Sequence, residues 1–317
     1  PPRSTPKPSS AASDVYKRQT SGIITATAFV PTTQGQLSHR NVWMNGEFSV
    51  AQRATQQTSV TNLSGYATGG PDRCFIVITN HGTWTIKQGT DAPPGFQNCM
   101  EMIATTGDSS VASNASVRWW QRFEGQDVQR FMKGTSSAKQ FAISFYIKAK
   151  QTGTYAFELL DYDSGQRHMV KTYTVDAAET WEYKSIIFPG DTTGPFDNDN
   201  QMSLAAEFWL VAGTDYTSGG TITDWATTVN NKRAGGHTVN AGASNNDYVR
   251  ITGVQLEVGP VSTPYEHRSY ADELARCHRY FYKSDGEADS GFRYWAHPYG
   301  NNAARRVTII HLSLIHI

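Results

Sequence analysis

Two pairs of aspartates are spaced so that their carboxylates could share a metal ion: Asp161 with Asp163, and Asp197 with Asp199. Calcium takes roughly six to eight oxygen ligands, so an Asp-x-Asp step supplies only the beginning of a site. Neither pair continues into an EF-hand pattern. We therefore expect two solvated acidic loops and no cofactor, with calcium as the alternative.

Carboxylates could also hydrolyse a glycosidic bond, which requires two of them to converge from different strands within a few ångströms. No motif in the chain marks such a pair, and there is no GxSxG, P-loop or GxGxxG sequence. The nine histidines include no HExxH; His267 and His278 flank a predicted helix, where ordinary polar packing is expected. The sequence therefore predicts no catalytic residues, and a glycan-degrading enzyme is kept only as a minor hypothesis.

Aromatic side chains offer a different chemistry, because an exposed ring can stack on a sugar ring. Trp119 and Trp120 are adjacent in a predicted strand, so they point to opposite faces and at least one of them is expected to leave the core of its sheet. Trp120 is the first candidate for a glycan contact, with Trp119 as the other member of the pair. Trp225 and Tyr216 rank next because they fall in a long polar insertion. The competing interpretation is that most of these rings are buried, since aromatic residues dominate cores.

Three cysteines lie far apart in the chain: Cys74, Cys99 and Cys277. A sparse, odd set with no CxxC pair argues against a disulfide framework, so buried or indifferent thiols are expected. The alternative is a single Cys74–Cys99 disulfide.

The elements that must position these residues read as β-strands. Residues 141–149 alternate strictly, with Phe141, Ile143 and Phe145 on one face. A short Gly153-containing link to residues 155–159 predicts a hairpin. Residues 204–212 form a continuous apolar run that favours a strand over a short helix, whereas residues 58–72 are polar and glycine-rich and are read as a loop. Further strands are expected at residues 74–79, 83–87, 100–104, 116–124, 170–175 and 181–188.

A closing segment follows a long polar insertion at residues 213–247. Residues 251–258 form the last strand, which Gly259-Pro260 stops, and Ser269 stands three residues before Asp272 as a capping-box-like helix start. Leu274, Cys277 and Phe281 share one face of that helix. This face fits an inter-chain contact and packing on the chain's own domain equally well.

Together these elements predict an all-β fold, a jelly-roll-like antiparallel β-sandwich followed by a short α-helix and the start of a truncated second β module. Apolar residues make up 38% of the 317 residues, enough for a sizeable core. Lys+Arg and Asp+Glu both count 28, so no overall charge attracts nucleic acid. No apolar run approaches the ~20 residues that span a bilayer, so membrane insertion is not expected.

Several blocks also resemble one family. ITGVQLEVG, followed by TPYEHRSYADELARCHRYFY, is similar to the end of a β-sandwich domain in tail-fibre proteins of tailed bacteriophages and prophages. Earlier blocks in the expected order are NGEFSVAQR, WWQRFEGQDV, FAISFYIKAKQTGTYAF and TWEYKSIIFPGDTTGPF, together with Trp225. The resemblance covers roughly residues 41–283 and implies a non-enzymatic virion structural and adhesion module, assembled in the host cytoplasm into the phage tail. It also implies a homotrimer, contacts with other tail proteins and recognition of a host-surface glycan.

The resemblance leaves one alternative from another class, a carbohydrate-binding module of a secreted bacterial glycan-active enzyme. Residues 1–19 and 312–317 resemble translated sequencing-adapter fragments found at the ends of metagenomic reading frames, and we expect both to be foreign to the natural protein. The predicted organisation is 1–19 disordered, 20–40 linker or preceding module, 41–266 sandwich, 267–283 connecting helix, 284–311 truncated β module and 312–317 foreign.

Overall fold

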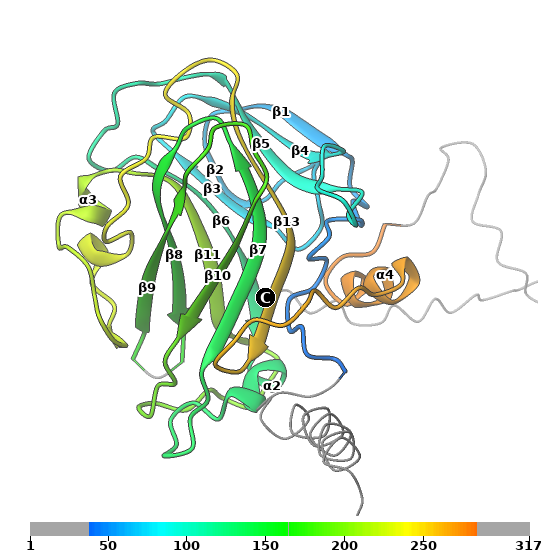
Figure 1. The fold of residues 1–317 in the computed structure, drawn as a ribbon, viewed down its shortest axis with the longest axis vertical. Coiled ribbons are helices and arrows are strands. Elements are labelled where there is room, and N and C mark those ends of the chain that lie inside the picture. Colours follow the sequence, from blue (N-terminus) through cyan, green and yellow to red (C-terminus); the bar gives the residue numbers. More distant parts are fainter. Residues whose placement is uncertain (1–37, 164, 284–317) are drawn as a thin grey trace, which may run out of the picture.

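The computed structural model describes residues 38–163 and 165–283, which form two antiparallel β-sheets packed face to face. The predicted β-sandwich is confirmed. Expectations for residues 1–37 and 284–317, including the truncated second module and the foreign ends, lie outside the described residues. Figure 1 shows the two layers, with the closing helix at one side beside the first described residues.

The two sheets are called sheet A and sheet B. In spatial order, sheet A contains β1 (Gln56–Val60), β4 (Thr83–Gly89), β5 (Cys99–Thr106), β13 (Asp247–Val258), β7 (Phe141–Ala149) and β10 (Glu182–Phe188). Sheet B contains β12 (Ala226–Thr227), β9 (Arg167–Val175), β8 (Gly153–Asp161), β11 (Met202–Ala212), β6 (Ser116–Glu124), β3 (Phe75–Thr79) and β2 (Leu63–Tyr66). The last long strand of the described residues, β13, therefore lies inside sheet A between β5 and β7.

Alternation along the strands builds the core between the sheets. In β7, Phe141, Ile143 and Phe145 point inward and are fully buried, as their spacing predicted. From β6 of the opposite sheet, Trp119 stacks on Phe208 at 4.6 Å between ring centroids. Of the two adjacent tryptophans of β6, Trp119 therefore faces the interior and Trp120 faces away from it.

The predicted hairpin between residues 141–149 and 155–159 is wrong. These segments are β7 and β8, and they belong to different sheets: β7 pairs with β10 and β13, whereas β8 pairs with β9 and β11. Residues 150–152 connect β7 of sheet A to β8 of sheet B. Each of these strands has one apolar face that must be buried. That face is buried equally well when the two strands face each other across the core as when they pair side by side.

Residues 58–72 were also misread as a loop, because β1 and β2 fall largely within them. Both are short strands at sheet edges, where exposed polar side chains are tolerated and the apolar alternation is weak. The insertion at 213–247 contains short elements of its own. The helices of the described chain are α2 (Gly125–Val128), η1 (Gln129–Phe131), α3 (Thr214–Thr217), η2 (Asn230–Lys232) and α4 (Tyr270–His278).

The helix α4 begins as predicted. The Ser269 side chain accepts a hydrogen bond from the backbone N–H of Asp272 and so caps the first turn. None of the helices that the structure describes has the length and apolar content needed to cross a bilayer.

Candidate functional site

A groove of about 720 Å³ lies between α4 and the first described residues. Its walls include Ser38, His39, Glu266, Arg268 and Asp272. Acidic and basic side chains alternate along it, so the groove carries no dominant charge. The groove is therefore formed jointly by residues 38–39, which lead into the sandwich, and by α4, which follows its last strand.

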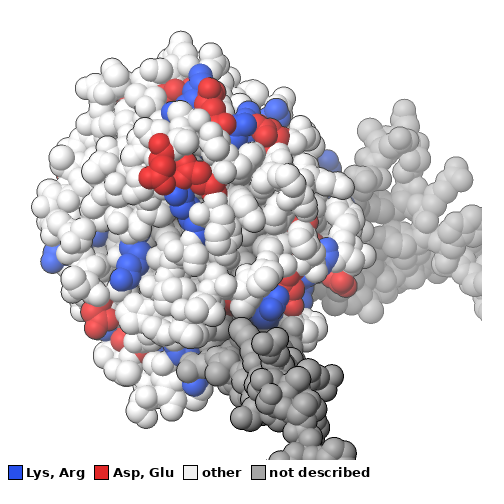
Figure 2. All heavy atoms as spheres, viewed as in Figure 1, with Lys and Arg blue, Asp and Glu red and all other residues white. Residues whose placement is uncertain are grey.

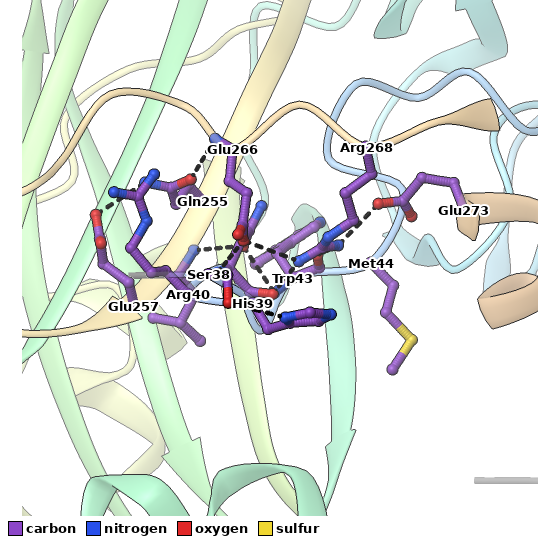
Figure 3. A network of polar contacts seen from close by, with 12 residues as sticks. Ser38, His39, Arg40, Trp43, Met44, Gln255, Glu257, Glu266, Arg268 and Glu273 are labelled. Atoms are coloured by element: carbon purple, nitrogen blue, oxygen red, sulfur yellow. Dashed lines mark hydrogen bonds and ion pairs between the residues drawn. The ribbon is translucent and has the colours of Figure 1, made fainter. Parts of the chain in front are cut away.

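Arg268 is the centre of a polar network beneath this groove (Figure 3). Its guanidinium donates to the backbone carbonyls of Asn41 and Trp43, and it pairs with Glu273 of α4 at 2.8 Å. Glu266 accepts from the backbone N–H of Asn41 at 2.9 Å. Arg268 and Glu273 are both largely buried, so these bonds are shielded from water and hold the two segments in one arrangement.

The network continues to the loop that follows Trp43. Glu273 also accepts from the backbone N–H of Asn45 at 2.6 Å, and the Asn45 amide bonds the carbonyls of Val50 and Asp72. Asn45 has a positive φ of 56°, which asparagine tolerates better than most residues. The Asn45-Gly46 dipeptide is thus a turn, and the turn is tied to α4.

The far end of α4 is fixed to sheet B. Arg279 forms a two-pronged pair with Glu124 at 2.6 and 2.7 Å, and the Tyr280 hydroxyl donates to the same carboxylate. Burial alone would raise the pKa of Glu124, but the hydrogen bonds from Arg279 and Tyr280 hold that pKa below its usual value. Glu124 is therefore a charged anchor for the helix. We call the contacts of Arg268, Glu273, Arg279 and Glu124 the junction.

Replacing Arg279 with alanine is expected to loosen the end of α4. Its side chain is 40% exposed, so the loss of stability should be modest, about 1 kcal/mol. Amide hydrogen exchange in α4 should accelerate roughly five-fold while exchange in β7 and β11 stays unchanged. Arg276→Ala in the same helix is the control and should leave exchange unaltered; equal exchange in both variants would mean that Glu124 does not anchor the helix.

Sheet B carries a second polar cluster on its outer face. Glu158 of β8 and Glu207 of β11 are direct partners in the sheet, and both are fully buried. Arg233, which follows η2 in the insertion, lies over them and pairs with each at 3.0 Å. Arg118 pairs with Glu207 at 2.8 Å, and His168 Nδ1 lies 2.8 Å from Glu158. Two carboxylates do converge here, but cations fill the space between and above them.

These glutamates were missed from the sequence, although a signal was present. Each stands alone inside an apolar run, in YAFELL and in LAAEFWLVA. A single charged residue in such a run indicates a buried charge that needs a partner. The partner itself, Arg233, lies in a polar loop with no pattern that marks it.

The structure places the four aromatic candidates in different environments. Trp120 lies on the outer face of sheet B, but it is only 5% exposed because Phe75 stacks on it at 4.7 Å and Arg118 lies above its ring. Trp119 and Trp225 belong to the main core, so proposing them as ligand contacts was wrong. Both were misassigned for the same reason: a tryptophan suits a buried core as well as a surface that stacks on sugars, so the residue type alone does not distinguish the two. Tyr216 of α3 is half-buried against Trp209 and remains a prediction.

The aspartates predicted as weak calcium ligands have other partners. Asp161 is fully buried and pairs with the Lys133 ammonium at 2.6 Å. Asp163 accepts from the backbone N–H of Asp197, and Asp199 accepts from that of Gln201. Within the described residues no three acidic, histidine or cysteine side chains gather in a way that could hold a metal ion. The calcium alternative is therefore wrong for Asp161, whose cation is a lysine.

The cysteines are free and buried in the described structure. Cys74 precedes β3 of sheet B and Cys99 opens β5 of sheet A, so the alternative Cys74–Cys99 disulfide is not formed. Burial raises the pKa of Cys99 to about 12, and that of Cys277 is raised as well. Cys277, 1% exposed, and Phe281, whose ring lies 3.6 Å from the Arg53 guanidinium, pack on their own sandwich. Of the three residues proposed for an inter-chain contact, only Leu274 is left, half-buried on α4.

Comparison with known proteins gives matches among solved structures alone. No protein-family model matches the chain, and no curated protein matches its sequence. The enzymatically active domain of bacteriophage CBA120 tailspike protein 4 is 11% identical with a TM-score of 0.35, over 69% of this chain and 21% of that one. A Bacteroides thetaiotaomicron protein described as sugar binding is 14% identical with a TM-score of 0.40, over 69% of this chain and all of that one.

A third match is the family 11 carbohydrate-binding module from Clostridium thermocellum, in complex with a β-1,3-1,4-mixed-linked tetrasaccharide. It is 15% identical with a TM-score of 0.31, over 66% of this chain and 99% of that module. At these values the likeness is that of one β-sandwich to another. The sugars and the activity in these descriptions belong to those proteins.

Proposed function

We propose that this chain is a non-enzymatic structural and adhesion module of a phage tail fibre, and that its sandwich contacts a glycan on the host-cell surface. The junction is the observation that supports the structural part. The helix that carries the chain onward is tied to the sandwich at both ends, through Arg268–Glu273 and Arg279–Glu124. A module in a fibre must pass its orientation to its neighbour, and buried ion pairs at the exit provide that stiffness.

The arrangement of the buried carboxylates supports a binding role over a catalytic one. Glu158 and Glu207 are direct partners in the sheet, yet Arg233 pairs with both of them and both are closed off from solvent. A sugar could reach them only if the insertion moved away. As they stand, these residues hold the insertion down on sheet B. The sequence resemblance, which spans most of the described chain, gives the tail-fibre context and the expectation of a homotrimer.

Immunogold electron microscopy tests this proposal at the level of the particle. Antibodies against the whole chain should label the tails of phage particles induced from the source strain. Binding of the fluorescent chain to the same host's cells should be lost after periodate oxidation of surface sugars. Labelled secreted enzyme complexes, with unlabelled phage particles, would instead establish the alternative, a carbohydrate-binding module of a secreted bacterial glycan-active enzyme.

A further inference from the structure

Four aromatic side chains cross the outer face of sheet A in a line, which we call the aromatic row: Tyr183, Tyr146, Phe96 and His267. Tyr183 of β10 and Tyr146 of β7 are direct partners in the sheet, and Tyr146 is next partnered by Thr252 of β13. At that point Phe96, from the β4–β5 loop, lies over Gly253. The row therefore runs across neighbouring strands, perpendicular to their direction.

The rings follow one another at nearly constant steps. Centroid distances are 5.2 Å from Tyr183 to Tyr146, 5.4 Å from Tyr146 to Phe96 and 5.3 Å from Phe96 to His267. Tyr183 is 49% exposed and His267 is exposed, while the two rings between them are partly exposed. This differs from Trp120 on sheet B, whose ring is covered. The aromatic row is thus a continuous apolar track that solvent can reach.

The position of Phe96 depends on a glycine. Gly253 sits in a bulge of β13 with φ at +62°, and a Cβ there would come within 2.7 Å of the Phe96 ring. The loop that carries Phe96 is held at its other end by Asp91. That carboxylate pairs with Lys148 at 2.9 Å and with Arg250, and it accepts from the Trp181 indole N–H at 3.2 Å. The track is therefore fixed before any ligand arrives.

Polar side chains flank the row on both sides at the neighbouring outward positions of the strands. On one side Lys148, Arg250 and Glu101 are successive partners across the sheet, and Glu101 is buried. On the other side Ser185 is exposed, whereas its successive partners Ser144 and Gln255 are buried, and residues 262–264 bond Ser185 and Gln255. Arg250 is paired with both Asp91 and Glu101, so the charged side has its positive and negative groups matched. A ligand here meets hydrogen-bonding groups without a strong net field.

Figure 2 agrees with this description of the surface. On the side of the molecule that it shows, Lys, Arg, Asp and Glu atoms gather in a few small groups, and uncharged atoms cover most of the area between them. An anionic polymer would require a stretch of unpaired cations, and a protein partner would need a broad apolar patch. A narrow aromatic track flanked by polar groups suits neither as well as it suits a sugar chain.

We propose that the aromatic row is a binding site for an uncharged pyranose oligosaccharide, whose successive rings lie on Tyr183, Tyr146 and Phe96. The polar groups beside the row that solvent can reach, which are those of Lys148, Arg250, Asp91 and Ser185, would bond its hydroxyl groups. This inference rests on the proposed adhesion function and gives it a location. It also moves the expected ligand contact from the tryptophans of sheet B to the tyrosines of sheet A.

The test uses the whole chain on an array that holds both neutral and acidic oligosaccharides of bacterial surface polysaccharides. Wild-type protein should bind neutral glycans, and Tyr183→Ala should weaken that binding about ten-fold. The double variant Tyr146→Ala/Tyr183→Ala should abolish it. Tyr282→Ala is the matched control. This tyrosine is 54% exposed, follows the end of α4 and lies outside the aromatic row, so the variant should bind as the wild-type protein does.

The contrary outcomes are distinguishable. If glycan binding survives the double variant but is lost with Trp120→Ala, the site lies on sheet B and the adhesion function stands without this inference. If wild-type protein binds only acidic glycans, the proposed ligand class is wrong. If it binds no glycan on the array and no host cells, the adhesion function itself fails. Melting curves within about 2 °C of wild type would establish that each variant is folded.

Discussion

Replacing Arg233 with methionine is expected to lower the free energy of unfolding by about 3–5 kcal/mol at neutral pH. The substitution keeps most of the side chain's apolar volume but removes the cation from two buried carboxylates. Glu158 and Glu207 would then face each other as like charges in a site closed to water. Urea denaturation of the full chain measures the loss. Lys232→Met, one residue earlier and half-buried, should cost less than about 0.5 kcal/mol.

The Arg233→Met effect should also depend on pH in a definite direction. Burial raises the pKa of Glu207, whereas for Glu158 burial, the largest single influence, is outweighed by the charges and hydrogen bonds of Arg233 and His168 together, so its pKa is lowered. Without Arg233 both carboxyl pKa values rise, so the folded variant binds a proton at a pH where the unfolded chain, with glutamate near 4.3, does not. The deficit should therefore be largest near pH 8 and should shrink toward pH 5. A deficit that is equal at both values would contradict the pairing.

Lys133→Met is expected to have an effect of similar size, about 3–5 kcal/mol, at a second buried ion pair. The Lys133 side chain is fully buried, and its ammonium lies 2.6 Å from Asp161, 3.2 Å from Asp191 and 2.6 Å from the carbonyl of Gly194. The rings of Phe196 and Trp225 complete its surroundings. This lysine occupies the place that a metal ion takes in other acidic loops. Removing it leaves a buried carboxylate without a counter-charge.

Thermal and urea unfolding of Lys133→Met would test this role. Lys139→Met is the matched control, since it lies half-buried in the same loop region and should change stability by less than about 0.5 kcal/mol. Adding Asp161→Asn to Lys133→Met should recover part of the loss, because the pair is then replaced by uncharged groups of similar shape. A single variant that loses less than about 1 kcal/mol would show that the buried pair is dispensable.

The strands were predictable wherever one face is buried. The alternation of Phe141, Ile143 and Phe145 fixed β7 in advance, and the apolar run at 204–212 became β11. The alternation of apolar residues does not show which strand a given strand pairs with. The supposed hairpin at Gly153 is instead a crossing between sheets, since an inward-facing pattern is the same whether the neighbour lies beside the strand or across the core.

The candidate sites were less predictable because they depend on contacts between distant residues. Arg233 reaches Glu158 over a separation of 75 residues, and Arg268 reaches Asn41 over 227. No local pattern marks such pairs. The aromatic row has the same character, because Tyr183 and Tyr146 become neighbours only through the pairing of β10 with β7. By contrast, the start of α4 was predicted from Ser269 and Asp272, since a helix cap is set by residues three apart.

The place of β13 inside sheet A has a consequence for how the protein is made. In the sequence this strand comes after every other strand of sheet A, yet β5 and β7 both need it as their hydrogen-bonding neighbour. Until residue 258 has left the exit tunnel, sheet A is two half-sheets with open edges, which can pair with the wrong chain. The two halves of sheet A can therefore join only once β13 is available, which makes this strand the last requirement for a closed sheet.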